Sequence, residues 1–371
     1  MTRCCFAPTR AVAPACAALW LARLVLLSVV LITSGGGAAA EDRTALPAGV
    51  ELPVRVRVAL RVLNVLEVKE TAGEGRFFVE ITQRWTDPRL AFDAIAVGAA
   101  RIDRVAGEAD SYLASIWTPG LVVDNQIGGR DSRTVAVATY ASGEIVLIER
   151  FEADFRFRMN MDAFPFDRQN LALSLSLPRY AKQEAILITT ETDRLLSGVE
   201  ESSLVVWRPG RLRFANEETM GWNARSYSRL AATVELVRQS DRYILRIFVP
   251  LFAVLSVSLF VLWSPALREQ EKDKGTMIFS SLLGLAALSF TFEASFPGAI
   301  SLNTPVAQMI SLGYLYLVLV LMIEVGLTAA CADPTRRFHA ACIELRRQIR
   351  WALPVMMLIV CIGIGVRALP G

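Results

Sequence analysis

The chain has 371 residues, 53% of them hydrophobic, and a formal net charge of +3. Its mean hydropathy of +0.41 is too high for an ordinary soluble domain, so we expect membrane spans beside a folded soluble part. The small net charge gives nucleic-acid binding little support, and the single histidine and six cysteines argue against a zinc or copper site.

Residues 1–40 have the organisation of a secretory signal peptide. Three arginines precede the apolar run Leu24–Thr33, and small residues follow it up to Ala40. Because the run is too short for a stable span, cleavage is favoured over an uncleaved anchor. We therefore expect an exported domain, residues 41–241. This domain has no cysteine, so its own core rather than a disulfide must hold it together.

The exported domain is dominated by stretches in which apolar and polar side chains alternate. This period of two is typical of half-buried strands. Many such stretches, separated by Gly, Pro and Asp, predict an extracytoplasmic all-β sandwich that is immunoglobulin-like, with about ten strands. The clearest alternating stretches are Val54–Val62, Phe77–Trp85, Asp154–Met161 and Leu171–Leu177.

Residues 242–371 are expected to form a four-helix transmembrane domain, because each apolar run can cross a bilayer. Lysines and arginines occur in the first and third connections and are absent from the second, so the first and third connections are predicted to be cytoplasmic. This topology places the exported domain and the C-terminus on the same outer side. The predicted helices cover about residues 244–263, 274–295, 304–331 and 350–368.

Four motifs follow one another along the chain and carry a family resemblance. Together with the four apolar helices, they resemble the pentameric ligand-gated ion channels, in particular their bacterial members. The resemblance implies a homopentameric five-fold ring in a bacterial inner membrane, and a channel rather than an enzyme. The motifs are RWTDPRL (Arg84–Leu90), WTPGLVVDN (Trp117–Asn125), FPFDRQNL (Phe164–Leu171) and RQSDRYILRIFVP (Arg238–Pro250).

The chain departs from the animal members in the loop that contains the Phe-Pro-Phe-Asp motif. Those members close this loop with a disulfide, whereas Phe157 and Leu171 stand at the two cysteine positions here. Both residues lie on apolar strand faces, so packing is expected to replace the crosslink. Bacterial members also lack this disulfide, which favours a prokaryotic source.

In this family the second helix of each subunit lines the pore. The resemblance places one stripe of this helix toward the axis, with a carboxylate first, hydroxyls next and apolar side chains last. A second stripe, formed by Ile278, Leu282, Leu285 and Ser289, has the same periodicity. The hydroxyls favour the first stripe, although Ser and Thr can also serve helix packing alone. The predicted pore-lining residues are Asp273, Thr276, Ser280, Leu283, Ala287 and Phe290.

Two features of these helices concern charge. Five copies of Asp273 would form a ring that attracts cations, so the predicted permeant ions are monovalent cations. Lys272 and Lys274 would oppose this ring unless their long side chains turn away from the axis. Glu324, inside the third apolar run, has two interpretations. We favour one in which it reaches the cytoplasmic membrane interface, and the other is proton sensing.

The resemblance also places the coupling between the two domains. The tip of the Phe-Pro-Phe-Asp loop would rest on the connection between the second and third helices, about Pro297–Pro305, with the turn Glu70–Arg76 as a second contact. Asp167 and Arg238 match positions that pair in the family, and opposite charges suit a partly buried junction. The predicted coupling residues are Phe164, Pro165, Phe166, Asp167, Arg238 and Pro297.

The sequence gives the weakest evidence for the ligand site. Family agonists bind between subunits, often in an aromatic box that holds an ammonium, and the box is incomplete here. Two acids and three aromatic residues would suit a small amine. The two acids could instead be solvated strand residues without a ligand. Protons could also open the channel directly by binding to carboxylates. Ca²⁺ binding is a third alternative, but it needs a dense acidic loop, and none is visible in the sequence. The candidate residues are Glu80, Asp124, Tyr180, Trp222 and Tyr227.

The sequence therefore predicts a cation channel that contacts membrane lipids and opens in response to a small amine-like ligand from the outer side. The alternatives are a proton-gated cation channel of the same fold and a membrane-tethered binding protein that does not conduct. No catalytic constellation, cofactor motif or nucleic-acid partner is predicted.

Overall fold

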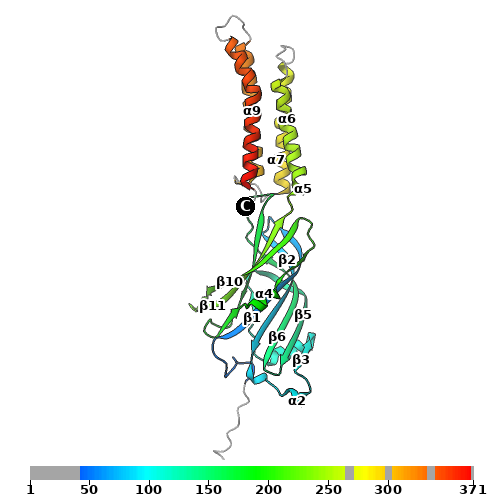
Figure 1. The fold of residues 1–371 in the computed structure, drawn as a ribbon, viewed down its shortest axis with the longest axis vertical. Helices are drawn as coiled ribbons and strands as arrows, with labels where there is room; N and C mark the ends of the chain where they lie inside the picture. Colours follow the sequence, from blue (N-terminus) through cyan, green and yellow to red (C-terminus); the bar gives the residue numbers. More distant parts are fainter. Residues whose placement is uncertain (1–41, 264–270, 297–302, 332–338, 369–371) are drawn as a thin grey trace, which may run out of the picture.

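The computed structural model describes residues 42–263, 271–296, 303–331 and 339–368. In these residues the molecule is elongated, with a β-domain at one end and long helices at the other (Figure 1). The predicted signal peptide, residues 1–40, lies outside the described residues, as does Pro297.

The larger sheet of the β-domain has seven strands. These strands are β1 (Val54–Lys69), β2 (Glu74–Thr86), β3 (Arg101–Val105), β5 (Gln126–Tyr140), β6 (Glu144–Arg156), β8 (Ala185–Ile188) and β9 (Gly198–Ser202). Their spatial order is β3–β5–β6–β2–β1–β8, and β9 pairs with β1. In β1 the side chains of Val56, Val58 and Leu60 are fully buried, because every second residue of a strand faces the same side.

The smaller sheet has four strands and packs its apolar face on the larger one. Its strands are β4 (Val122–Val123), β7 (Arg168–Ser176), β10 (Trp207–Met220) and β11 (Ser226–Arg238), in the order β10–β11–β7–β4. Leu171, Leu173 and Leu175 of β7 are at most 2% exposed and belong to the core between the sheets. The all-β sandwich predicted by the alternation is therefore present.

The described residues contain eleven strands, in agreement with the predicted number of about ten. The shortest of them, β4, has two residues and therefore shows no alternating pattern. Four short helical segments complete the domain: η1 (Pro88–Leu90), α2 (Ala94–Val97), α3 (Ala106–Ser115) and α4 (Glu191–Leu195).

Packing holds the loop between Phe157 and Leu171, as expected from their apolar side chains. Phe157 is 7% exposed and meets the ring of Phe77 edge-on at 5.4 Å, and Leu171 is fully buried. The turn between β1 and β2 packs against the backbone of Phe157. Gly73 in this turn has a φ of +65°, and a Cβ at this position would lie 2.7 Å from the carbonyl oxygen of Phe157. Only glycine combines this backbone conformation with so close an approach.

Four helices in the described residues are long and apolar enough to cross a membrane. The first runs without a break through α5 (Asp241–Tyr243), the π-helical turn η2 (Ile244–Phe248) and α6 (Val249–Trp263). The others are α7 (Glu271–Ser295), α8 (Pro305–Cys331) and α9 (His339–Ala368). This is the arrangement of a multi-pass membrane protein.

The fourth helix begins well before the predicted start near residue 350. α9 starts at His339, and its first turns are rich in charge, from Glu344 to Arg350. A start chosen from hydropathy misses these turns, because a polar extension of an apolar helix carries no apolar signal. The other predicted helix boundaries differ from the structure by a few residues, as helix ends commonly do.

Candidate pore and gating site

The two candidate stripes of α7 lie on different faces of the helix. Ile278 and Leu285 of the second stripe are 1% and 0% exposed, so this stripe packs inside the subunit. Each residue of the other stripe is exposed in the single subunit, including Leu283 at 73% and Phe290 at 72%. This exposed face contains Asp273, Thr276, Ser280, Leu283, Ala287 and Phe290.

The side chain of Arg238 organises the junction between the β-domain and the helices. Its Nε donates to Oδ1 of Asp167 at 2.6 Å, and its Nη1 donates to Oε1 of Glu70 at 2.6 Å. The Arg238 and Asp167 side chains are at most 2% exposed. Burial alone would lower the pKa of Arg238, but the hydrogen bonds to Asp167 and Glu70 outweigh burial and hold the pKa above its ordinary value. We call these three residues the junction cluster.

Aromatic rings surround the junction cluster. The guanidinium of Arg238 lies 4.1 Å from the ring centroid of Trp207 and 4.9 Å from that of Phe164, within cation–π range. Phe164 is itself fully buried, and its ring lies 5.2 Å from Tyr243 and 4.9 Å from Phe296, just beyond the end of α7. The tip of the loop thus contacts both the start of the first long helix and the end of α7.

The remaining predicted coupling residues lie in the same region. Pro165 is buried, and the half-buried ring of Phe166 stacks on Phe248 with centroids 6.4 Å apart. The predicted contact with the connection at Pro297 concerns residues outside the described ranges. The structure instead shows the loop tip against Phe292 and Phe296 of the preceding segment.

Glu324 does not reach a solvated interface as expected. It is 6% exposed and lies between α7 and α9. Its Oε1 accepts a hydrogen bond from Nζ of Lys274 at 2.9 Å and another from Nη2 of Arg346. The physical reason is that a carboxylate buried among helices needs cationic partners, and two cations on neighbouring helices supply them. We call Lys274, Glu324 and Arg346 the far-end cluster.

The five candidate ligand residues do not form one cluster in the subunit. No hydrogen bond or ring contact within the described residues joins any two of them. Tyr180 packs on Trp117 with ring centroids 5.4 Å apart, Trp222 is fully exposed, and the hydroxyl of Tyr227 accepts a hydrogen bond from Asn223.

Both candidate acids bind arginine, although only Glu80 is buried and Asp124 lies on the surface. Glu80 is 5% exposed, and its carboxylate binds Arg61 at 3.1 Å and Arg150 at 2.5 Å. Asp124 accepts hydrogen bonds from Ser176 and, at 2.6 and 2.9 Å, from Arg229. Each carboxylate is therefore already neutralised by arginine.

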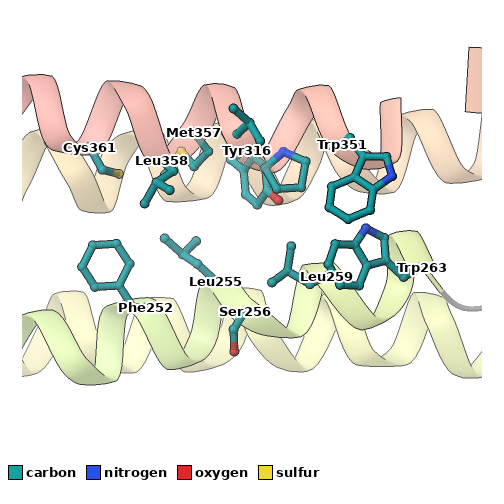
Figure 2. Close-up of a pocket in the computed structure, with 12 residues that line it drawn as sticks. Phe252, Leu255, Ser256, Leu259, Trp263, Tyr316, Trp351, Met357, Leu358 and Cys361 are labelled. Atoms are coloured by element: carbon teal, nitrogen blue, oxygen red, sulfur yellow. The ribbon is translucent and has the colours of Figure 1, made fainter. Parts of the chain in front are cut away.

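An apolar cavity of about 350 Å³ lies between α6 and α9 (Figure 2). One end is bounded by Trp263 and Trp351, whose ring centroids are 4.9 Å apart. Figure 2 shows Leu255, Leu259 and Leu358 facing the cavity from the two helices. A lining of this kind suits hydrocarbon rather than ions or water.

Comparison with known families decides what the chain is. Residues 41–240, more than half of the chain, match the family model of the neurotransmitter-gated ion-channel ligand-binding domain. The chain belongs to the pentameric ligand-gated ion channel family. The match covers the β-sandwich, and the four long helices that follow fit the membrane part of this fold. The members of this family are ion channels and not enzymes.

Three curated relatives extend this result. The chain is 25% identical over 314 residues to a proton-gated ion channel of Gloeobacter violaceus, a match covering 83% of this chain and 81% of the relative. It is 25% identical over 222 residues to a pH-sensitive chloride channel 2 of Drosophila melanogaster, covering 57% of this chain and 41% of the relative. A pH-sensitive chloride channel 2 of Anopheles gambiae is 24% identical over 220 residues, covering 56% and 34%.

Sequence reasoning missed the arginines that hold the acidic residues. Arg61 and Arg150 lie opposite Glu80 on neighbouring strands, since Arg61 pairs with Glu80 in β1–β2 and Arg150 pairs with Glu80 in β2–β6. The signal was present as alternating charge on three strands. It could be used only with the strand register, which a single sequence does not fix.

Proposed function

We propose that this chain forms a homopentameric channel that conducts monovalent cations across a bacterial inner membrane, with its C-terminus on the outer side. The observation that carries the proposal is the exposed face of α7. A carboxylate stands at its first end, two hydroxyls follow, and apolar side chains complete it. This order suits an entrance that attracts cations and an apolar constriction that closes by dewetting.

We propose that protons on the outer side, rather than an amine, control opening. Glu80 and Asp124 already bind arginines, so neither offers a free charge to an ammonium. The names of the three relatives also point to proton gating or pH sensitivity. The single histidine, His339, begins α9 rather than lying in the β-domain. Outer protons would therefore act on carboxylates and weaken their arginine pairs.

An amine ligand is the second candidate, and one observation favours it. Trp222 is fully exposed in the turn that joins β10 to β11, although a large apolar side chain is usually covered. In a ring of subunits, this indole could cover a cation bound at the neighbouring interface.

Current recordings from purified protein in liposomes test these proposals. External pH is lowered from about 7 to about 4, the range in which carboxylates take up protons, and primary amines are applied separately at neutral pH. Currents evoked by acid alone support proton gating, and currents evoked by amines alone favour the second candidate. A protein that assembles but passes no current in either test would be the non-conducting binding protein.

Selectivity and lipid contact have separate measurements. A reversal potential that follows the cation gradient in dilute external salt supports cation conduction, and one that follows chloride rejects it. The cavity between α6 and α9 and the exposed apolar faces of these helices suit lipid acyl chains. Phospholipid that co-purifies and is displaced by a Leu259→Trp substitution would support this contact.

A further inference from the structure

Two residues of opposite charge, Asp273 and Lys274, are neighbours at the beginning of α7, and they differ in their exposure to solvent. Asp273 is exposed, and it has no ion pair within the described residues. Lys274 is 5% exposed. The carboxylate thus remains available to the surroundings of the helix, while the ammonium is withdrawn into the subunit.

Glu324 of the far-end cluster binds the ammonium group of Lys274 inside the subunit. Nζ of Lys274 lies 2.9 Å from Oε1 of Glu324, with side-chain exposures of 6% and 8%. Arg346, 11% exposed, reaches the same carboxylate oxygen from α9. A single carboxylate on α8 therefore fixes one cation from the helix before it and one from the helix after it. This cluster lies at the end of the bundle remote from the β-domain, where α7 begins (Figure 1).

Burial of Lys274 has a cost that needs an explanation. The start of a helix carries a partial positive charge, which disfavours a nearby cation and favours a carboxylate such as Asp273. A lysine also has a flexible four-carbon stem that tends to bring its ammonium to water. Without a strong partner, Lys274 would be expected to leave the interior for the aqueous mouth beside Asp273.

The consequence for conduction is electrostatic. A ring of five carboxylates favours cations, and five ammonium groups at the same level would offset that field. Successive residues of an α-helix are about 100° apart, so both charges can approach the same mouth unless one is held back. The sign of the field therefore depends on where the lysine side chain points.

We propose that Glu324 is a positioning residue that sets charge selectivity by holding Lys274 inside the subunit. Glu324 does not face the exposed stripe of α7 and does not act on ions directly. It leaves Asp273 as the exposed charge at this end of the helix. This inference rests on the proposed channel function, in which the exposed face of α7 lines the pore.

The test compares reversal potentials of reconstituted channels in a potassium chloride gradient. Glu324→Gln removes the carboxylate that Lys274 and Arg346 share, and the loss of this negative charge favours release of the lysine to water. The expected result is a fall of about tenfold in the permeability ratio of potassium to chloride. In the double variant Glu324→Gln/Lys274→Gln, the ratio is expected to return to the wild-type value, which a general structural defect would not produce.

The single variant Lys274→Gln is the matched control and a second test. Glu324 keeps Arg346 in this variant, so folding is expected to survive, and the selectivity of the wild type should not change. A clear rise in cation preference would mean that Lys274 already acts on the pore, and would overturn the proposal. This variant decides the matter if Glu324→Gln does not assemble.

The outcomes separate this inference from the proposed function. A wild-type channel that prefers chloride rejects cation conduction, but a further shift toward chloride in Glu324→Gln still supports the role of Glu324. A cation-selective wild type with unchanged selectivity in Glu324→Gln rejects the inference alone. A selectivity loss that Lys274→Gln fails to rescue also rejects it.

Discussion

The junction cluster and the far-end cluster each consist of one central charged residue bound to two residues of the opposite charge. The central residue is a cation at the junction and an anion at the far end. At the junction, one arginine binds the two carboxylates of Asp167 and Glu70. At the far end, one carboxylate binds the two cations of Lys274 and Arg346. In both places the central residue is buried, and its removal would leave two like charges close together in a poorly solvated site.

The surroundings of the two clusters differ, and the difference indicates different tasks. Aromatic rings pack around Arg238 and connect the β-domain to two helices, which suits transmission of a signal between domains. The far-end cluster joins three helices of one bundle and adjoins the exposed Asp273, which suits control of charge at an entrance. Under the proposed function, a buried ion pair would serve coupling in one region and selectivity in the other.

Removal of the arginine at the junction should have the largest effect. Arg238→Gln leaves Asp167 and Glu70 without their cation, and we expect a loss of about 3–5 kcal/mol in the free energy of unfolding. Thermal unfolding and size-exclusion chromatography of the purified protein measure this change. Arg229→Gln is the control, because its pair with Asp124 is partly exposed and should contribute about 0–1 kcal/mol. Similar effects of the two variants would contradict the special role of the junction cluster.

The aromatic part of the junction can be tested by itself. Phe164→Ala removes ring contacts to Tyr243 and Phe296, with an expected cost of about 3 kcal/mol and a weaker response to acid. Current per assembled channel distinguishes lost coupling from lost protein. Phe166→Ala is the comparison within the same loop: among the described residues this half-buried ring contacts the ring of Phe248 alone, so its effect on the acid response should be smaller. An unchanged acid response in Phe164→Ala would argue against transmission through this ring.

The two faces of α7 should respond differently to one polar substitution. Leu283→Ser places a hydroxyl on the exposed face, and we expect the spontaneous open fraction to rise about tenfold because the constriction wets more readily. Leu285→Ser, on the fully buried face, should instead lower thermal stability without opening the channel. Single-channel recording and thermal unfolding provide the two measurements. If Leu285→Ser opened the channel and Leu283→Ser only lowered stability, the face with Leu285 would line the pore instead.

The smallest expected effect concerns the exposed charge beside the far-end cluster. Asp273→Asn removes the negative charge and should lower single-channel cation conductance about twofold, with a shift of the reversal potential toward chloride. Glu344→Gln on the exposed surface of α9 removes the same charge away from α7 and should leave both quantities unchanged. Equal conductance in wild type and Asp273→Asn would show that the carboxylate does not face the ion path.

Much of the fold could be predicted because its signals are local. Alternation in β1, β2, β6 and β7 and four long apolar runs do not depend on distant contacts. The start of α9 at His339 could not be read in this way, because its first turns are polar. The pairing of Asp167 with Arg238 was accessible through a motif resemblance.

The rest of the site depends on which elements meet. Glu324 is separated by 50 residues from Lys274 and by 22 from Arg346, and no periodicity indicates that these three side chains share one place. The arginines that neutralise Glu80 likewise require the register of three strands. A single sequence can indicate that a buried carboxylate needs a cationic partner, but it does not identify that partner.

The far-end cluster also has a mechanical consequence. One carboxylate ties the base of α7 to both neighbouring helices, so this base should act as a pivot while the opposite end, beside Phe164, forms the moving arm. The helix has 25 residues and is therefore about 37 Å long. A tilt of about 5° at the pivot would displace the opposite end by about 3 Å, given that length. Small movements of the β-domain would then tilt α7 about its base, which Glu324 ties to the neighbouring helices.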